Sequence, residues 1–242
     1  YDKLLKTSKD IFEIGFEKLS DKPFISFWEM AKQLPSLIKL KSYLTVSQLV
    51  NSKLKNKYLR KAFSIHPLLV GGNPFTTTSI YALIHYLERK WGVYFCMGGT
   101  GKIVKELENL MVRQGIDIKK QSDVERISIT NGKAENVVLT DGSKIEADLV
   151  ICNADPPTVY SEMLPSKYSR DSLLKPKKFT HYSMGLYVLF FGSKKKFSNV
   201  AHHTIWMSER YKDLLHDIFE KKILTDDFSL YLHRPTATDE TF

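Results

Sequence analysis

The feature that most constrains the fold is a pair of glycine turns, Asn131-Gly132 and Asp141-Gly142. Both dipeptides favour the tight turns of β-hairpins, because their residues tolerate positive φ angles. Strand-like runs surround these turns at 124–129, 134–139 and 145–151. The sequence therefore predicts an antiparallel meander of three strands.

A helix is expected just before the meander, opening at Gly98-Gly99-Thr100-Gly101 and ending at Gly115. Its apolar residues recur at helical spacing: Ile103, Val104, Leu107, Leu110 and Met111. A short buried strand is expected at 116–119. The N–H groups at the helix start could face an anion or a polar ring edge, although a plain turn explains the same glycines.

Helices are also expected on the N-terminal side, within 1–19 and from 46 to 63. Between them, Ser26-Phe27-Trp28-Glu29 matches a capping box. An apolar stripe then runs to Pro35, formed by Phe24, Phe27, Trp28, Ala31 and Leu34. A further helix should be capped by Thr78 or Ser79 and run through Lys90, followed by a short strand at 91–95.

The pattern changes after about residue 160. Strands are expected at 184–191, 202–207 and 228–233, and a helix at 210–220. These elements suggest an antiparallel sheet with helices on one side. The whole chain is therefore predicted to combine an α/β part with an α+β part.

Composition allows a sizeable core, since 43% of the 242 residues are apolar. The net charge of +9 fits an anionic membrane, an anionic cofactor or nucleic acid, but no nucleic-acid-binding motif is recognisable. The segment 30–62 has eight Lys and Arg residues and no acidic one. It suits a surface for anionic lipid, and a solvated helix face remains the alternative.

Several chemistries lack a sequence signature. The two cysteines, Cys96 and Cys152, are far apart, which argues against a disulfide framework and for a reducing compartment. Dinucleotide, P-loop, zinc-protease and serine-hydrolase motifs are missing. Neighbouring residues of a strand point to opposite faces, so His202 and His203 are not expected to share a metal ion. The other histidines are scattered: His66, His85, His181, His216 and His233. We predict no metal site.

Glu29 and Lys32 are candidates for chemistry. They are three residues apart on an expected helix and share a face with the aromatic stripe. A charged pair beside an aromatic wall could handle protons. The plainer explanation is that Glu29 completes the capping box and Lys32 is solvated.

Long strings of the chain resemble phytoene desaturases of the bacterial and fungal type, within the FAD-dependent amine-oxidase-like superfamily. They follow one another in order from His66 to His233: His66-Pro67-Leu68-Leu69-Val70-Gly71-Gly72-Asn73-Pro74-Phe75, Ser79-Ile80-Tyr81, Leu83-Ile84-His85, Trp91-Gly92-Val93, Gly98-Gly99-Thr100-Gly101, Asn153-Ala154-Asp155, Ala201-His202-His203-Thr204, Arg210-Tyr211 and Asp227-Phe228-Ser229-Leu230-Tyr231-Leu232-His233.

The resemblance implies an enzyme that removes hydrogens from phytoene toward neurosporene or lycopene. It implies FAD in a two-part, glutathione-reductase-like domain, with oxygen or a quinone as electron acceptor. It also implies a cytoplasmic protein attached peripherally to the membrane that holds its carotenoid substrate. On this basis, 1–95 is a helical part of the substrate domain, 96–158 is the second half of the FAD domain, and 159–242 is an antiparallel-sheet part of the substrate domain.

The resemblance also indicates site residues. Gly98 and Gly99 match a paired-glycine turn near the flavin ring, and Val124 takes the place of a strand residue that lies against the adenine. The strand end at Asn153-Ala154-Asp155 passes close to the cofactor. Glu29 and Lys32 match a region where the family often has an acid and an arginine, so lysine puts a bidentate contact in doubt.

Two parts of the family pattern are missing from the chain: the N-terminal dinucleotide fingerprint and the glycine-rich C-terminal cofactor motif. The chain also begins without Met. We therefore expect an internal fragment that binds FAD poorly or not at all and is inactive alone. The alternatives are a desaturase or isomerase for another polyene, such as a diapocarotenoid or a hydroxylated carotenoid, and a non-catalytic lipid- or protein-binding module.

Overall fold

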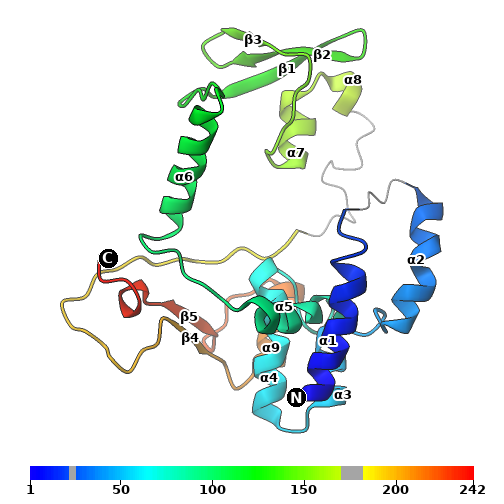
Figure 1. The fold of residues 1–242 in the computed structure, drawn as a ribbon, viewed down its shortest axis with the longest axis vertical. Coiled ribbons are helices and arrows are strands. Elements are labelled where there is room, and N and C mark those ends of the chain that lie inside the picture. Colours follow the sequence, from blue (N-terminus) through cyan, green and yellow to red (C-terminus); the bar gives the residue numbers. More distant parts are fainter. Residues whose placement is uncertain (22–25, 170–181) are drawn as a thin grey trace. The chain divides into compact units, whose positions relative to one another are not determined.

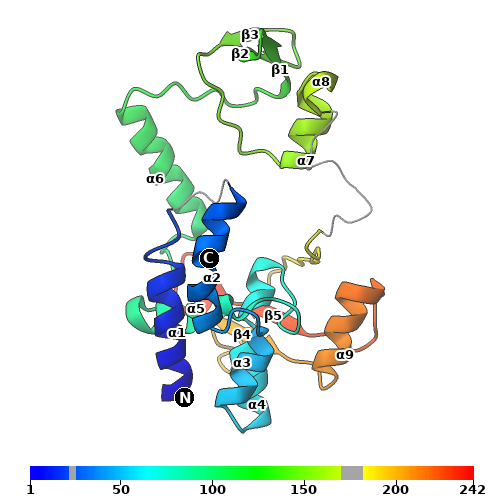
Figure 2. The ribbon, with the colours of Figure 1, turned by 90° about the vertical axis from the view of Figure 1, so that its right-hand side faces the viewer.

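The computed structural model describes residues 1–21, 26–169 and 182–242, so Phe24 and His181 lie outside it. The chain forms two compact units (Figures 1 and 2). The first unit joins Tyr1–Ile103 to Ser183–Phe242, and the second is Val104–Tyr182. Each unit is described by itself.

Helices form the N-terminal part of the first unit. They are α1 (Asp2–Gly15), α2 (Phe27–Lys39), α3 (Val46–Lys53), α4 (Lys57–Ser64) and α5 (Leu83–Trp91), with the 3₁₀ turns η1 (His66–Val70) and η2 (Ser79–Ala82). Figures 1 and 2 both show α1 beside α5. The core lies where α1 meets α3 and η2, around the buried side chains of Leu4, Ile11, Leu49 and Val50. None of the described helices is long and apolar enough to cross a membrane.

Phe12 is the largest fully buried side chain of this core. Its ring centroid lies 5.3 Å from that of Phe16 and 5.4 Å from those of Tyr86 and Trp91. Aromatic contacts of this kind add to the apolar area that the ring buries. They fix α1 against α5.

Capping explains where the helices begin. The predicted box at Ser26 is confirmed, because the Glu29 N–H donates to Ser26 Oγ and the Ser26 N–H donates to Glu29 Oε2. The helix passes through Pro35 to Lys39. The single helix predicted over 46–63 is wrong, because the Asn56 side chain accepts N–H bonds from Tyr58 and Leu59 and starts a new helix there.

The C-terminal part of the first unit contains a two-stranded antiparallel sheet of β4 (His203–Trp206) and β5 (Leu230–His233). Both strands were predicted to within two residues of their observed ends, whereas the helix α9 (Tyr211–His216) starts one residue after its predicted start and ends four residues before its predicted end. A π turn, η4 (Asp217–Lys221), continues α9, and η5 (Pro235–Ala237) follows β5. Lys61 Nζ of α4 donates to the carbonyls of Ser208 and Glu209, at 3.1 Å each, and ties this part to the helices.

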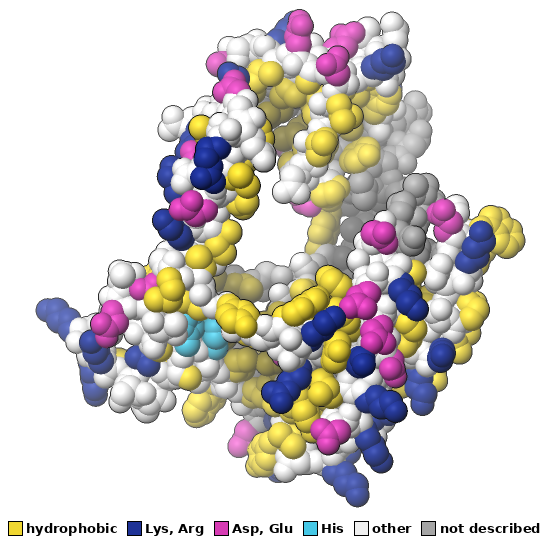
Figure 3. All heavy atoms as spheres, viewed as in Figure 1, with side chains coloured by type: hydrophobic (Ala, Val, Ile, Leu, Met, Phe, Trp, Pro, Cys, Tyr) yellow, Lys and Arg dark blue, Asp and Glu magenta, His cyan; other side chains and the backbone are white. Residues whose placement is uncertain are grey.

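The second unit contains the predicted meander. It is formed by β1 (Val124–Thr130), β2 (Lys133–Leu139) and β3 (Lys144–Glu146), paired antiparallel in that order. Ahead of it, α6 (Thr100–Arg113) carries apolar side chains along one side and charged ones along the other (Figure 3). After it come α7 (Pro156–Thr158), the π turn η3 (Val159–Met163) and α8 (Ser166–Ser169).

Four predicted strand segments are wrong. The segments 91–95, 116–119 and 184–191 lie outside any sheet, and the last meander strand stops at Glu146 instead of Ile151. A strand needs a neighbour for its backbone hydrogen bonds, and in the described parts of the chain no ladder pairs with these segments. Their side chains are correspondingly exposed, as at Phe190 (90%) and Ile151 (88%).

Candidate functional site

The Gly98-Gly99 turn contacts the C-terminal end of the first unit. Both glycines have left-handed φ angles, +83° and +80°. The Gly98 N–H donates to Oδ2 of Asp239 at 2.5 Å. The buried Asp239 carboxylate also accepts from the hydroxyl and the N–H of Thr241, at 2.7 and 3.0 Å. The bond from Gly98, followed by those from Thr241, lowers the pKa of Asp239. A charged carboxylate therefore fixes the turn that precedes α6.

A flat aromatic ring lies on this turn. A Cβ atom at Gly99 would come within 2.8 Å of Cζ of Phe242, so only glycine allows the ring so close. The Phe95 ring centroid lies 6.2 Å from that of Phe242 and 4.5 Å from that of His202. The turn is therefore shaped to accept an aromatic plane. Sequence reasoning found the glycines but missed Asp239 and Phe242, since no local pattern links them to residue 98.

Three histidines lie together beside Phe95. His202 Nε2 is 3.0 Å from His233 Nε2, and the ligand nitrogens of His202, His203 and His233 all lie within 4.8 Å of one another. The prediction that His202 and His203 point apart is wrong, because His202 precedes β4 and does not follow strand alternation. Desolvation, followed by the charges of His203 and His233, lowers the pKa of His202.

Glu29 and Lys32 are exposed on α2. The Glu29 side chain bonds to the Ser26 backbone, as the capping explanation requires. The two residues therefore lie on a helix surface, and a catalytic role for them stays a prediction.

The remaining predicted cofactor residues lie in the second unit. Val124 is the first residue of β1, pairs with Leu139 and is 36% exposed. Asn153, Ala154 and Asp155 are exposed in the segment that leads into α7. Gly98 and Gly99 belong to the first unit. A single cofactor that contacts both sets stays a prediction.

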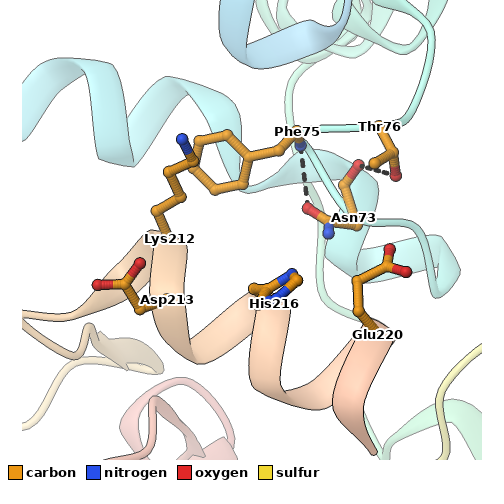
Figure 4. Close-up of a pocket in the computed structure, with 7 residues that line it drawn as sticks. All are labelled: Asn73, Phe75, Thr76, Lys212, Asp213, His216 and Glu220. Carbon is orange, nitrogen blue, oxygen red and sulfur yellow. Dashed lines mark hydrogen bonds between the residues drawn. The ribbon is translucent and has the colours of Figure 1, made fainter.

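The first unit also has a cavity of about 300 Å³ between the loop after η1 and α9 (Figure 4). Seven residues line it, and six of them have polar or charged side chains: Asn73, Phe75, Thr76, Lys212, Asp213, His216 and Glu220. Asn73 Oδ1 accepts the Phe75 N–H at 3.0 Å and so shapes one wall.

The model of the flavin-containing amine oxidoreductase family matches residues 4–223, which is most of the chain. The chain belongs to that family. Family membership identifies flavin as the cofactor class and agrees with a glycine turn that accepts an aromatic plane. It also confirms the predicted mixture of helices and small antiparallel sheets as part of a flavin-enzyme fold.

Within this flavin oxidoreductase family, the chain is similar to bacterial phytoene desaturases. It is 41% identical to the lycopene-forming enzyme of Pseudescherichia vulneris and to that of a Paracoccus species, over 99% of its length in both cases. It is 36% identical to the neurosporene-forming enzyme of Rhodobacter capsulatus over 97% of its length. The predicted resemblance is thus confirmed. The chain covers 45–49% of these proteins, so it spans about half the length of the curated relatives it matches.

Proposed function

We propose that this chain is part of an FAD-dependent phytoene desaturase, which dehydrogenates phytoene toward neurosporene or lycopene. The observation that carries the proposal is the 41% identity to a lycopene-forming phytoene desaturase over 99% of the chain. Identity of this extent, in the order of the whole chain, argues for a shared fold and a shared substrate class. The relatives differ in how far they carry the reaction, since some form lycopene and others neurosporene.

We further propose that the glycine turn holds the flavin end of FAD. Its side-chain-free surface suits a flat ring, and the ring of Phe242 already lies there. Val124 would lie near the adenine, and Asn153, Ala154 and Asp155 beside the rest of the cofactor. When bound, FAD supplies the two-electron acceptor for loss of hydrogen from neighbouring carbons. In this proposal 96–158 is half of a glutathione-reductase-like FAD domain, and 1–95 and 159–242 belong to the substrate domain.

Within this proposal, Asp239 positions the turn, since its carboxylate holds the Gly98 N–H. Glu29 and Lys32 are the proposed proton-handling pair. Oxygen or a quinone is the proposed final electron acceptor.

A membrane surface is the proposed location of the reaction, because phytoene dissolves in lipid. The helix α2 supports this. Four of its apolar side chains are more than half exposed: Phe27, Trp28, Leu34 and Ile38. The space-filling view shows apolar side chains along α2 with basic ones between them (Figure 3). Exposed rings flanked by lysines suit insertion at an anionic headgroup layer.

The test is pigment formation in a phytoene-producing bacterium that expresses the whole protein containing this chain. New visible absorption bands of an extended polyene in the extract, with a flavin spectrum in the purified protein, are the expected result. A bound flavin without new absorption bands would indicate that the substrate is another polyene or that the reaction is an isomerisation. Lipid binding without flavin would overturn the enzyme proposal in favour of a binding module.

A further inference from the structure

A second cluster of metal-ligand side chains lies among the helices of the first unit, away from the glycine turn in the sequence. His66 opens η1, while His85 and Glu88 lie one turn apart on the same face of α5. His66 Nε2 is 3.3 Å from each carboxylate oxygen of Glu88. The ligand atoms of all three residues lie within 4.8 Å of one another. Two segments of the chain thus bring two imidazoles and one carboxylate to one point.

Two ring nitrogens of this cluster are buried without a partner. They are Nε2 of His85 and Nδ1 of His66. The His85 side chain is 4% exposed and makes a hydrogen bond with the Phe63 backbone. Because Nε2 is unpartnered, that bond falls to Nδ1. A buried nitrogen without a partner is costly, so it calls for a ligand.

The bond to Phe63 is the kind that a metal-ligating histidine makes through its other nitrogen. Such a bond fixes the tautomer and leaves the free nitrogen as a donor of its lone pair. Ring contacts fix the orientation as well. The His85 centroid lies 5.3 Å from that of Phe63 and 4.4 Å, edge to face, from that of His66. The ring is therefore held in place before any ligand arrives.

We propose that His66, His85 and Glu88 bind a divalent transition-metal ion, with Zn²⁺ as the first candidate. Bonds of about 2.0–2.1 Å in a tetrahedral site place ligand atoms ~3.3 Å apart, which is the separation between His66 Nε2 and the Glu88 oxygens. Two imidazoles exclude Ca²⁺ and Mg²⁺ as preferred ions, since these take oxygen ligands. The Glu88 side chain is 40% exposed and leaves a path for the ion.

The histidine triplet of 202, 203 and 233 is the competing cluster. Four of its six ring nitrogens already have partners: His203 Nδ1 lies 2.7 Å from the Tyr231 hydroxyl, and His202 bonds through its two nitrogens to Thr238 and to His233 Nε2. His203 and His233 are also exposed. The unpartnered and buried Nε2 of His85 therefore favours the first cluster. The proposal is independent of the carotenoid function.

The test is titration of the 242-residue chain with Co²⁺, followed by competition with Zn²⁺. Visible d–d absorption at one equivalent, lost on addition of Zn²⁺, is the expected result. Glu88→Gln, which keeps the size of the side chain, should weaken binding at least ~10-fold, and His85→Gln should do so at least as strongly. His216→Gln, at an exposed histidine of α9, and the double variant His202→Gln/His233→Gln should bind like the unchanged chain.

Circular dichroism of each variant separates lost binding from lost folding. Glu88 is the decisive position, because its half-exposed side chain can change without opening the core. Zn²⁺ should raise the melting temperature of the unchanged chain and not that of Glu88→Gln. Equal affinity in Glu88→Gln and the unchanged chain would overturn the proposal. Loss of ion binding in His202→Gln/His233→Gln would also overturn the proposal, because it would show that the ion binds to the histidine triplet.

Discussion

Individual residues of the glycine turn determine how closely an aromatic ring can approach the backbone. Gly98 and Gly99 have nearly the same φ, but a Cβ would meet different neighbours. At Gly98 it would make an ordinary contact of 3.7 Å with Lys102, whereas at Gly99 it would meet the Phe242 ring at 2.8 Å. An alanine at Gly98 would therefore test backbone strain alone, whereas an alanine at Gly99 would test the same strain together with the contact to the Phe242 ring.

Gly98→Ala should destabilise the chain by roughly 1–2 kcal/mol, the cost of a left-handed residue that carries a Cβ. Gly99→Ala should cost up to about 1 kcal/mol more, because the half-exposed Phe242 ring must also move. Urea unfolding of both variants checks the difference. Equal losses at the two positions would show that the Phe242 contact contributes nothing.

Asp217 should make the stability of the first unit depend on pH. Its buried carboxylate bonds to Lys221 Nζ at 2.7 Å and Arg210 Nη2 at 3.0 Å, and these bonds, Lys221 first, lower its pKa. A pKa that is lower in the folded chain adds stability above the unfolded pKa of ~3.9, and that stability is lost as the pH falls through the folded value. Asp217→Asn should therefore be less stable than the unchanged chain at pH 6.

The difference in the free energy of unfolding between Asp217→Asn and the unchanged chain should disappear as the pH falls below 4. Urea unfolding at several pH values measures this difference. Asp213→Asn changes an exposed carboxylate on the same helix and is the control. A gap that is constant with pH would show that the ion pairs do not contribute.

At the scale of elements, helix caps and turns could be predicted from the sequence, but the pairing of strands with their neighbours could not. The capping box at Ser26 and the turns of the meander were found from the sequence, because each depends on residues within four positions. The helix over 46–63 failed, since its apolar spacing continues through a break made by Asn56. The strands at 116–119 and 184–191 failed because apolar residues alone do not supply a neighbouring ladder.

The break between α3 and α4 gives a direct test. Asn56 Oδ1 accepts the N–H of Tyr58 at 2.9 Å and that of Leu59 at 3.2 Å. Asn56→Ala should cost about 1 kcal/mol in the free energy of unfolding, whereas Asn56→Asp keeps the acceptor and should cost much less. Denaturant unfolding distinguishes them. Similar losses would show that the side chain does not cap α4.

At the scale of the whole molecule, the family was predictable but the assembly of the site was not. Strings such as those around Gly98 and His202 carried the resemblance that the comparisons confirm. The bond between Gly98 and Asp239 spans 141 positions, and His66 meets Glu88 across 22. No spacing rule anticipates contacts of that range, so Asp239, Phe242 and the His66 cluster emerged only from the fold.

The charge of the whole chain, +9, bears on membrane binding. Anionic vesicles should bind the chain, and the double variant Phe27→Ser/Trp28→Ser should lower the partition coefficient at least ~10-fold, because it removes two exposed rings from α2. The control Tyr187→Ser/Phe190→Ser removes two rings of similar exposure outside α2. Vesicle sedimentation measures both. Equal losses in the two variants would show that α2 is not the contact.

Both cysteines are free, and they lie in different units. Cys96 comes two residues before Gly98, and Cys152 directly precedes Asn153. Each thiol therefore neighbours a proposed cofactor residue in its own unit. A donor dye on one and an acceptor dye on the other would convert FAD binding into energy transfer. If both units hold the cofactor, FAD should narrow the distribution of energy-transfer efficiencies to one value. If only one unit holds it, FAD should leave that distribution unchanged.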